Sequence, residues 1–163
     1  SGFYYDRQIS STDKISTTEC TGKLLIKRGR GPEGWSPLWA KVAGLEQAKK
    51  VKDQMMNADE FNTLVPLGTA SKSNPAYNQD IYWRGRVWLD QLYFGLTALN
   101  NYGFTSQAKL LSTKLFDNAQ GLMSNGAIRE NYNPETGVVQ GATNFSWSAA
   151  HLLMLSREIP MKD

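Results

Sequence analysis

Residues 88–104 read WLDQLYFGLTALNNYGF, and this stretch carries the apolar pattern of a buried helix. Leucine recurs at positions 89, 92, 96 and 99, and Tyr93 falls on the same face. Spacings of three and four residues gather side chains on one side of a helix. Gly103 stands where helices often end, because glycine tolerates the left-handed backbone found there. The pattern predicts a helix over residues 82–101.

Three further stretches show the same periodicity and predict helices over residues 37–56, 105–123 and 145–157. The segments between them are long and rich in chemistry-bearing side chains. Residues 57–79 hold two prolines and no sustained period, which is typical of a loop. Because helical bundles have short polar loops, these long loops favour an α/α barrel whose site lies at one rim. We therefore predict an all-α fold.

The composition is that of one globular domain. The chain has 163 residues, of which 40% are hydrophobic and 20% charged, which excludes a disordered segment. No apolar run approaches the roughly 18 residues of a membrane-spanning helix. The net charge of +3 comes from scattered basic residues with one small group, KRGR at 27–30, so nucleic-acid binding gains little support.

Two single residues receive an unremarkable interpretation. Cys20 is alone in the sequence, so an intrachain disulfide is excluded and an inert thiol is expected. His151 lies between Ala150 and Leu152 in an apolar helix, where we expect a core histidine hydrogen-bonded to a neighbour.

Most of the candidate chemistry falls in three segments at loop-to-helix junctions. They read GPEGWSPLW (31–39), NQDIYWRGRVWLDQ (78–91) and IRENYNPETG (128–137). In the second segment, Tyr82 and Trp83 stand beside Arg84, and rings next to a guanidinium group can hold a polyhydroxyl ligand. For Trp88, further along the predicted helix, burial in the core is an equally good interpretation.

Four motifs in order carry a resemblance to a known family. GPEGWSPL, YWRGRVW, ENYNP followed by TG, and FSWSAAHL together resemble the C-terminal part of the catalytic domain of glycoside hydrolase family 63, most closely its bacterial α-glucosidases of the YgjK type. The likeness runs from Gly29 to Leu155, with a weaker match at GFYYD near the N-terminus. The polar stretch from Arg7 to Lys23 shows no family pattern.

The resemblance implies an (α/α)6 barrel that hydrolyses α-glucosides with inversion of configuration. It also implies that Glu130 is the general base, whereas Glu135 has no counterpart in the family motif. The family's general acid is an aspartate upstream of the first matched motif. We therefore expect residues 1–163 to be the C-terminal segment of one larger barrel domain, incomplete and inactive alone. The start at Ser1, without an initiator Met, agrees with this expectation.

Glu130 would have to stay ionised while partly enclosed. Its neighbours Asn131, Tyr132 and Asn133 offer amide and hydroxyl donors that lower the cost of holding that charge. Besides this catalytic residue, we expect seven residues to contact the sugar: Trp35, Tyr82, Trp83, Arg84, Asn131, Asn133 and Trp147.

The expected partners are a disaccharide or oligosaccharide substrate and the missing N-terminal portion of the same enzyme, with neither nucleic acid nor membrane. We predict no cofactor or metal ligand in this chain, because it lacks an acidic loop with calcium-ligand spacing. Some bacterial relatives bind calcium, so the resemblance places any such ion in the missing part. It also allows a periplasmic location.

An alternative function remains open from the residues alone. A carbohydrate-binding or interaction module without catalytic activity would also explain exposed aromatic rings and a single important carboxylate.

Overall fold

The structure is a computed structural model that describes residues 2–16 and 18–159. Its α-helices are α1 (Ser36–Trp39), α2 (Leu45–Met56), α3 (Leu89–Asn101), α4 (Thr105–Asn118) and α5 (Ser146–Glu158). Its strands are β1 (Arg7–Gln8), β2 (Lys23–Leu24), β3 (Val87–Trp88), β4 (Arg129–Tyr132) and β5 (Val139–Thr143). Short 3-10 helices cover Ile26–Arg28 and Pro32–Trp35.

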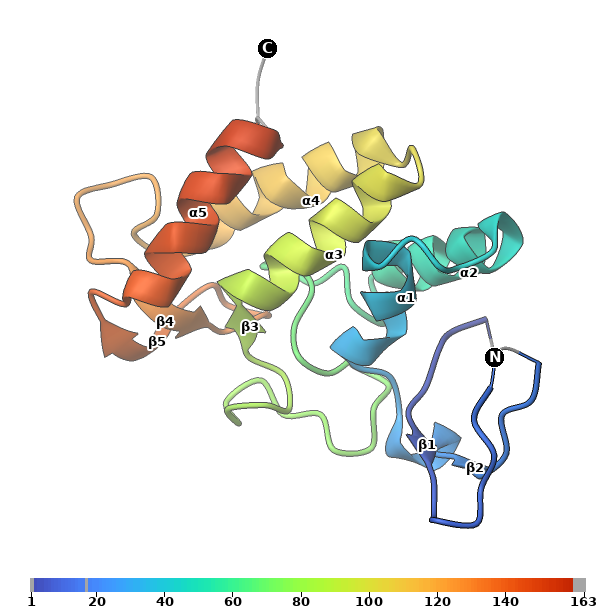
Figure 1. The fold of residues 1–163 in the computed structure, drawn as a ribbon. Coiled ribbons are helices and arrows are strands. Elements are labelled where there is room, and N and C mark those ends of the chain that lie inside the picture. The colour runs from blue at the N-terminus through green and yellow to red at the C-terminus, as the bar shows by residue number, and fades with distance from the viewer. Residues whose placement is uncertain (1, 17, 160–163) are drawn as a thin grey trace.

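Helix α3 is the centre of the molecule. It contacts α1, α4 and α5, and Figure 1 shows it between α5 on one side and α1 on the other. The leucines at 89, 92, 96 and 99 are all buried, as their spacing predicts. Each buried leucine side chain contributes about 1.5 to 3 kcal/mol of transfer free energy. Burial of this face therefore fixes where the two ends of α3 lie.

The predicted helix over 37–56 is two helices, α1 and α2. The chain reverses between them at Lys41, whose φ of 59° is left-handed, and α2 begins after Gly44. Val42 and Leu45, which continue the apolar pattern across this point, are 75% and 55% exposed. The apolar pattern therefore continues along the sequence, but the side chains that form it do not lie on one face of a single helix.

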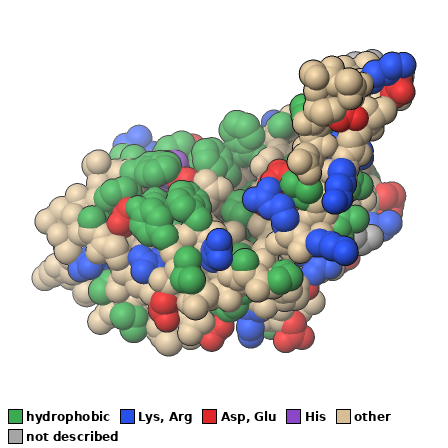
Figure 2. All heavy atoms as spheres, turned by 90° about the horizontal axis from the view of Figure 1, so that it is seen from below, with side chains coloured by type: hydrophobic (Ala, Val, Ile, Leu, Met, Phe, Trp, Pro, Cys, Tyr) green, Lys and Arg blue, Asp and Glu red, His purple; other side chains and the backbone are tan. Residues whose placement is uncertain are grey.

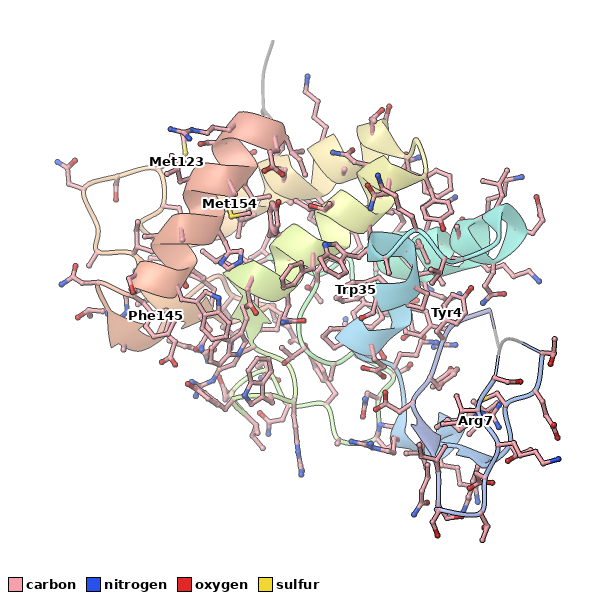
Figure 3. All side chains as sticks on the ribbon, in the orientation of Figure 1. Tyr4, Arg7, Trp35, Met123, Phe145 and Met154 are labelled. Carbon is pink, nitrogen blue, oxygen red and sulfur yellow. The ribbon has the colours of Figure 1, made fainter. Side chains whose placement is uncertain are left out.

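The fold is predominantly helical with two small sheets, so the all-α prediction needs correction. Strands β1 and β2 pair antiparallel in an N-terminal projection, where Figure 3 labels Arg7. Strands β3, β4 and β5 form a second antiparallel sheet in that order. Because Val87 and Trp88 pair with β4, helix α3 begins at Leu89 and not at residue 82 as predicted.

The long loop between α2 and β3 is largely internal in its first half. Residues 65–71 are buried, and Leu67 packs against α3 where Gly95 leaves room for it. An ion pair between Arg30 and Glu60 anchors the loop, and the Ser73 hydroxyl also donates to the Glu60 carboxylate. These contacts bring the loop that follows, residues 74–86, to the same end of the molecule as β4 and β5 (Figure 1).

Among the residues that the structure describes, no helix combines the length and apolar character needed to cross a bilayer.

Trp35 belongs to the core that these elements enclose. It is 1% exposed, and its ring meets Phe61 edge-on at 5.1 Å (Figure 3 labels Trp35 beside α1). We predict that Trp35→Ala lowers the free energy of unfolding by about 3 to 5 kcal/mol, the usual cost of emptying such a site. Urea denaturation measures this, with Trp35→Phe as a control that refills much of the volume. A loss below about 1 kcal/mol for the alanine variant would contradict the packing described.

Candidate active site

Glu130 lies in the middle of β4, opposite an irregularity in β5. Arg129 pairs with Thr143 and Asn131 pairs with Gln140, so one residue on β4 faces two on β5, Gly141 and Ala142. This is a β-bulge, which bends a strand and redirects the groups beside it. The bulge places the backbone of β5 directly against the Glu130 side chain.

Gly141 makes that close approach feasible. Its φ is 69°, and a Cβ atom at this position would lie 2.3 Å from Oε2 of Glu130. Only glycine offers both the left-handed conformation and the space. The next residue, Ala142, donates its backbone N–H to Oε2 of Glu130 at 3.0 Å. One carboxylate oxygen is therefore held by the main chain of the bulge.

The other carboxylate oxygen is held by the loop that precedes β3. The Tyr82 hydroxyl donates to Oε1 of Glu130. The pKa of Tyr82 is raised above its ordinary value, mainly because its hydroxyl donates to this carboxylate. Glu130 itself is 9% exposed, and Ser148 of α5 donates to its main-chain oxygen at 3.2 Å. Two elements thus hold the carboxylate, and a third, α5, holds the main chain of the same residue.

An aromatic cluster, defined here as Tyr82, Trp83, Trp88 and Trp147, lies beside this carboxylate. Trp83 and Trp88 stack in parallel with ring centroids 4.3 Å apart, and both Tyr82 and Trp147 meet Trp88 edge-on. Trp88 is 3% exposed and donates its indole N–H to the main-chain oxygen of Tyr82, whereas Trp83 and Trp147 are 47% and 46% exposed. Figure 2, the view from below, shows hydrophobic side chains gathered into a patch with basic side chains near it. The cluster offers flat rings to a ligand, and the buried Trp88 supports them from behind.

The structure does not bring Trp35 to this cluster. Its ring is enclosed in the core, so the expected sugar contact is corrected to a packing role. His151 has its expected hydrogen bond to a neighbour, because Nδ1 lies 2.9 Å from the main-chain oxygen of Trp147, but it is only half-buried and does not lie in the core as predicted. Cys20 is a free, exposed thiol.

The two asparagines also differ from expectation, because both are buried and bonded to protein. Asn133 donates from Nδ2 to Asp80, while its Oδ1 accepts the N–H groups of Glu135 and Thr136. Asn131 is fully buried, and its Oδ1 accepts from Arg86 at 3.2 Å. These placements favour a role in shaping the site over the predicted contact with sugar.

The segment carrying Glu130 was expected to be a loop and is instead the β4–β5 hairpin. Likewise, Trp83 and Arg84 lie in a turn before β3, since the Arg84 N–H donates to the main-chain oxygen of Ile81, and do not begin a helix. Glu135 lies in the hairpin turn, exposed to solvent, where it accepts from the Tyr77 hydroxyl at 2.8 Å. Burial and this carboxylate raise the pKa of Tyr77.

A cavity of about 510 Å³ lies next to Trp83. Trp83 and Arg84 line it together with Glu33, and Lys27 and Arg28 reach it from the N-terminal projection. Burial is the main cause that raises the pKa of Glu33 above its ordinary value. Sequence reasoning included Glu33 in the GPEGW motif but gave it no role. A carboxyl group with a raised pKa in a cleft is a recognised signal of a functional site.

Within residues 2–16 and 18–159, no group of three or more His, Cys, Asp or Glu side chains is placed to hold a metal ion.

Comparison with known proteins connects this geometry to one family. The model of the mannosylglycerate hydrolase MGH1-like glycoside hydrolase domain matches residues 1–148. The chain is 28% identical over 156 residues to a mannosylglycerate hydrolase of Thermus thermophilus, and the match covers 96% of this chain and 34% of that protein. It is 31% identical over 112 residues to alpha-glucosidase 2 of Arabidopsis thaliana, covering 60% of this chain and 14% of that protein.

A solved structure has a similar fold. The crystal structure of a GH63 mannosylglycerate hydrolase from Thermus thermophilus in complex with glucose superposes with a TM-score of 0.70 at 25% identity. The superposition covers 96% of this chain and 35% of that one. The chain therefore spans about a third of the length of the Thermus thermophilus hydrolases it matches, and less of the glucosidase.

The bulge geometry generates a stability prediction with a matched control. Gly141→Ala and Gly103→Ala both force alanine into a left-handed backbone, with φ of 69° and 77°, which costs about 1 to 2 kcal/mol. A Cβ at Gly103 meets nothing within 4 Å, whereas at Gly141 it collides with Glu130. Urea denaturation should show a further loss of about 1 to 3 kcal/mol for Gly141→Ala alone. Equal losses in the two variants would show that β5 does not press on the Glu130 side chain.

Proposed function

The chain belongs to the mannosylglycerate hydrolase MGH1-like glycoside hydrolases of family 63, and on this basis we propose that it forms part of an inverting glycosidase. In this proposal Glu130 is the general base, and the aromatic cluster forms part of the rim that binds sugar. The general acid comes from sequence outside this chain. We expect the chain by itself to lack turnover, since one carboxylate cannot act as both proton donor and base.

The observation that carries the proposal is the double restraint on the Glu130 carboxylate. An inverting hydrolase needs one carboxylate to take a proton from the attacking water and another to protonate the leaving group, with about 6.5 to 9.5 Å between them. The Tyr82 hydroxyl and the Ala142 N–H each occupy one acceptor direction of Glu130. A carboxylate has about four such directions, so others remain for the attacking water.

The rings beside Glu130 support a sugar as the ligand. One face of Trp83 is covered by Trp88, and the ring is 47% exposed, which leaves its other side for the apolar face of a pyranose. Arg84, in the adjacent cavity, can donate paired hydrogen bonds to hydroxyl or carboxylate groups.

Two kinds of substrate agree with this arrangement. An α-glucoside agrees with the family 63 motifs and with the relative named alpha-glucosidase 2. Mannosylglycerate agrees with the relative from Thermus thermophilus, and the basic side chains of Lys27, Arg28 and Arg84 at the cavity would suit the carboxylate of its glycerate group. Turnover of each substrate by the complete enzyme distinguishes them.

We propose that the remaining helices of an (α/α)6 barrel cover apolar side chains that this chain leaves open. Trp39 on α1 and Leu153 on α5 are both about half exposed. Met154, which Figure 3 labels, follows Leu153 on α5 and is also exposed. Such side chains are expected where the two parts of one barrel meet.

The alternative is a binding module without catalysis. It would bind sugar through the aromatic cluster, and replacement of the Glu130 carboxylate would not change its function.

Replacement of Glu130 tests the catalytic proposal. In the complete enzyme, Glu130→Gln keeps the side-chain shape but cannot deprotonate water, so kcat should fall by roughly 10² to 10⁴-fold. Substrate affinity and melting temperature should change little. Steady-state kinetics and thermal unfolding measure these quantities.

Glu135→Gln is the matched control for that experiment, because Glu135 lies in the same hairpin, exposed at its turn. Its kcat should remain near that of the unmodified enzyme. Near-normal turnover in Glu130→Gln, or a greater loss in Glu135→Gln, would refute the assignment of the base.

Replacement of Trp83 tests the sugar-binding rim. Trp83→Ala in the complete enzyme should weaken substrate binding by about 1 to 3 kcal/mol, as truncation of a well-packed aromatic contact does. Trp83→Phe keeps a ring that can stack and should retain most of the affinity. Isothermal titration with a slowly hydrolysed substrate analogue gives both values. Unchanged affinity in Trp83→Ala would remove this residue from the binding surface.

A further inference from the structure

Asp80 joins the two segments that hold the Glu130 carboxylate. Its Oδ1 atom accepts two side-chain hydrogen bonds from the hairpin, from Asn133 Nδ2 at 3.0 Å and from Gln140 Nε2 at 2.9 Å. Asp80 itself lies in the loop between α2 and β3, two residues before Tyr82. A single oxygen atom therefore connects that loop to both arms of the β4–β5 hairpin.

Asn133 and Gln140, the two donors to Asp80, lie next to the turn and next to the bulge of the β4–β5 hairpin. Asn133 follows β4 directly, and its Oδ1 accepts the N–H groups of Glu135 and Thr136, so this side chain shapes the turn. Gln140 precedes Gly141, where the bulge begins. Gln140 pairs with Asn131, the residue after Glu130, and Asn133 lies further toward the turn. Fixing both side chains therefore sets the position of β5 against β4 on the turn side of the Glu130 carboxylate.

The main chain of Asp80 is also held in place by hydrogen bonds. Arg86 donates from Nε and Nη2 to the main-chain oxygen of Asp80, at 3.0 and 2.7 Å. The same guanidinium group donates from Nη1 to Asn131 of β4. The N–H of Asp80 is in turn bonded to Oδ1 of Asn78 at 2.9 Å. Asp80 therefore has little freedom to follow the hairpin if its own bonds to the hairpin are lost.

We propose that Asp80 is a positioning residue for the general base. Tyr82 holds Oε1 of Glu130 from the loop, and Ala142 holds Oε2 from the hairpin. These two donors remain aligned on one carboxylate only while loop and hairpin keep their relative position. The pairing of β3 with β4 and the Arg86 bond to Asn131 join loop and hairpin at β4, and the Oδ1 bonds of Asp80 add the connection to the turn and to β5. The inference rests on the proposed function of Glu130.

The test uses Asp80→Ala and Asp80→Asn in the complete enzyme. Asp80→Ala removes the acceptor of both amide donors, and kcat should fall by about 10 to 100-fold, the effect of a small displacement of a catalytic group. KM should change less than kcat, because Trp83 is also held by its stacking on the buried Trp88. Asp80→Asn keeps an oxygen at the position of Oδ1, so it should restore kcat to within a few-fold of the unmodified enzyme.

Asp13→Ala serves as a control for general loop disruption. Like Asp80, Asp13 is a carboxylate that organises an exposed loop, since its oxygens accept from Ser10 and Thr21. It lies in the N-terminal projection, and its replacement should leave kcat unchanged.

Hydrogen–deuterium exchange gives a readout that does not depend on turnover. Peptides covering residues 78–86 and 139–143 should exchange faster in Asp80→Ala than in Asp80→Asn. Faster exchange in these peptides together with the loss of kcat supports the proposal. Unchanged exchange, or a kcat in Asp80→Ala equal to that of Asp80→Asn, overturns it. Failure of the general-base assignment would appear separately, as normal turnover in Glu130→Gln.

Discussion

The site depends on the restraint of one carboxylate by two elements that are far apart in sequence. Tyr82 and Ala142 each donate to one oxygen of Glu130, and a β-bulge supplies the second of these donors. The bulge requires the left-handed conformation of Gly141. The Oδ1 bonds of Asp80 add to the β3–β4 pairing in holding the Tyr82 loop against the hairpin. An enclosed carboxylate without such donors would be costly to keep ionised. The hydrogen bonds therefore make a buried base physically reasonable in this position.

The helices serve this arrangement by fixing where the strands end. Burial of the leucine face of α3 positions β3, because Trp88 and Leu89 are consecutive. Helix α5 begins close to the same place, and its Ser148 donates to the main chain of Glu130. Trp88 and Trp147, at or just inside the starts of these two helices, thereby meet at 5.8 Å. The packing of α3 against α5 therefore determines how the aromatic cluster and Glu130 lie relative to each other.

Sequence periodicity detected the long helices, because their apolar faces are buried against one another. It joined α1 and α2 across the turn at Lys41, extended α4 beyond its end at Asn118, and failed before α3, where strand pairing overrides the local pattern. The sequence predicts a helix from residue 82, but Val87 and Trp88 adopt an extended conformation and pair with β4. The family resemblance singled out Glu130, but its hairpin was missed because RENY and VQGAT lack an alternating apolar pattern. Asn133 resembled a sugar ligand in sequence, and only its three bonds to protein reveal its role in the turn.

The most direct test of this account is a crystal structure of the complete enzyme with a substrate analogue bound. The decisive measurement is the position of the water nearest the anomeric carbon. The account predicts that this water lies about 2.6 to 3.2 Å from the Glu130 carboxylate, with the Tyr82 and Ala142 hydrogen bonds intact. A sugar bound away from Glu130, or a water held by another carboxylate, would contradict it.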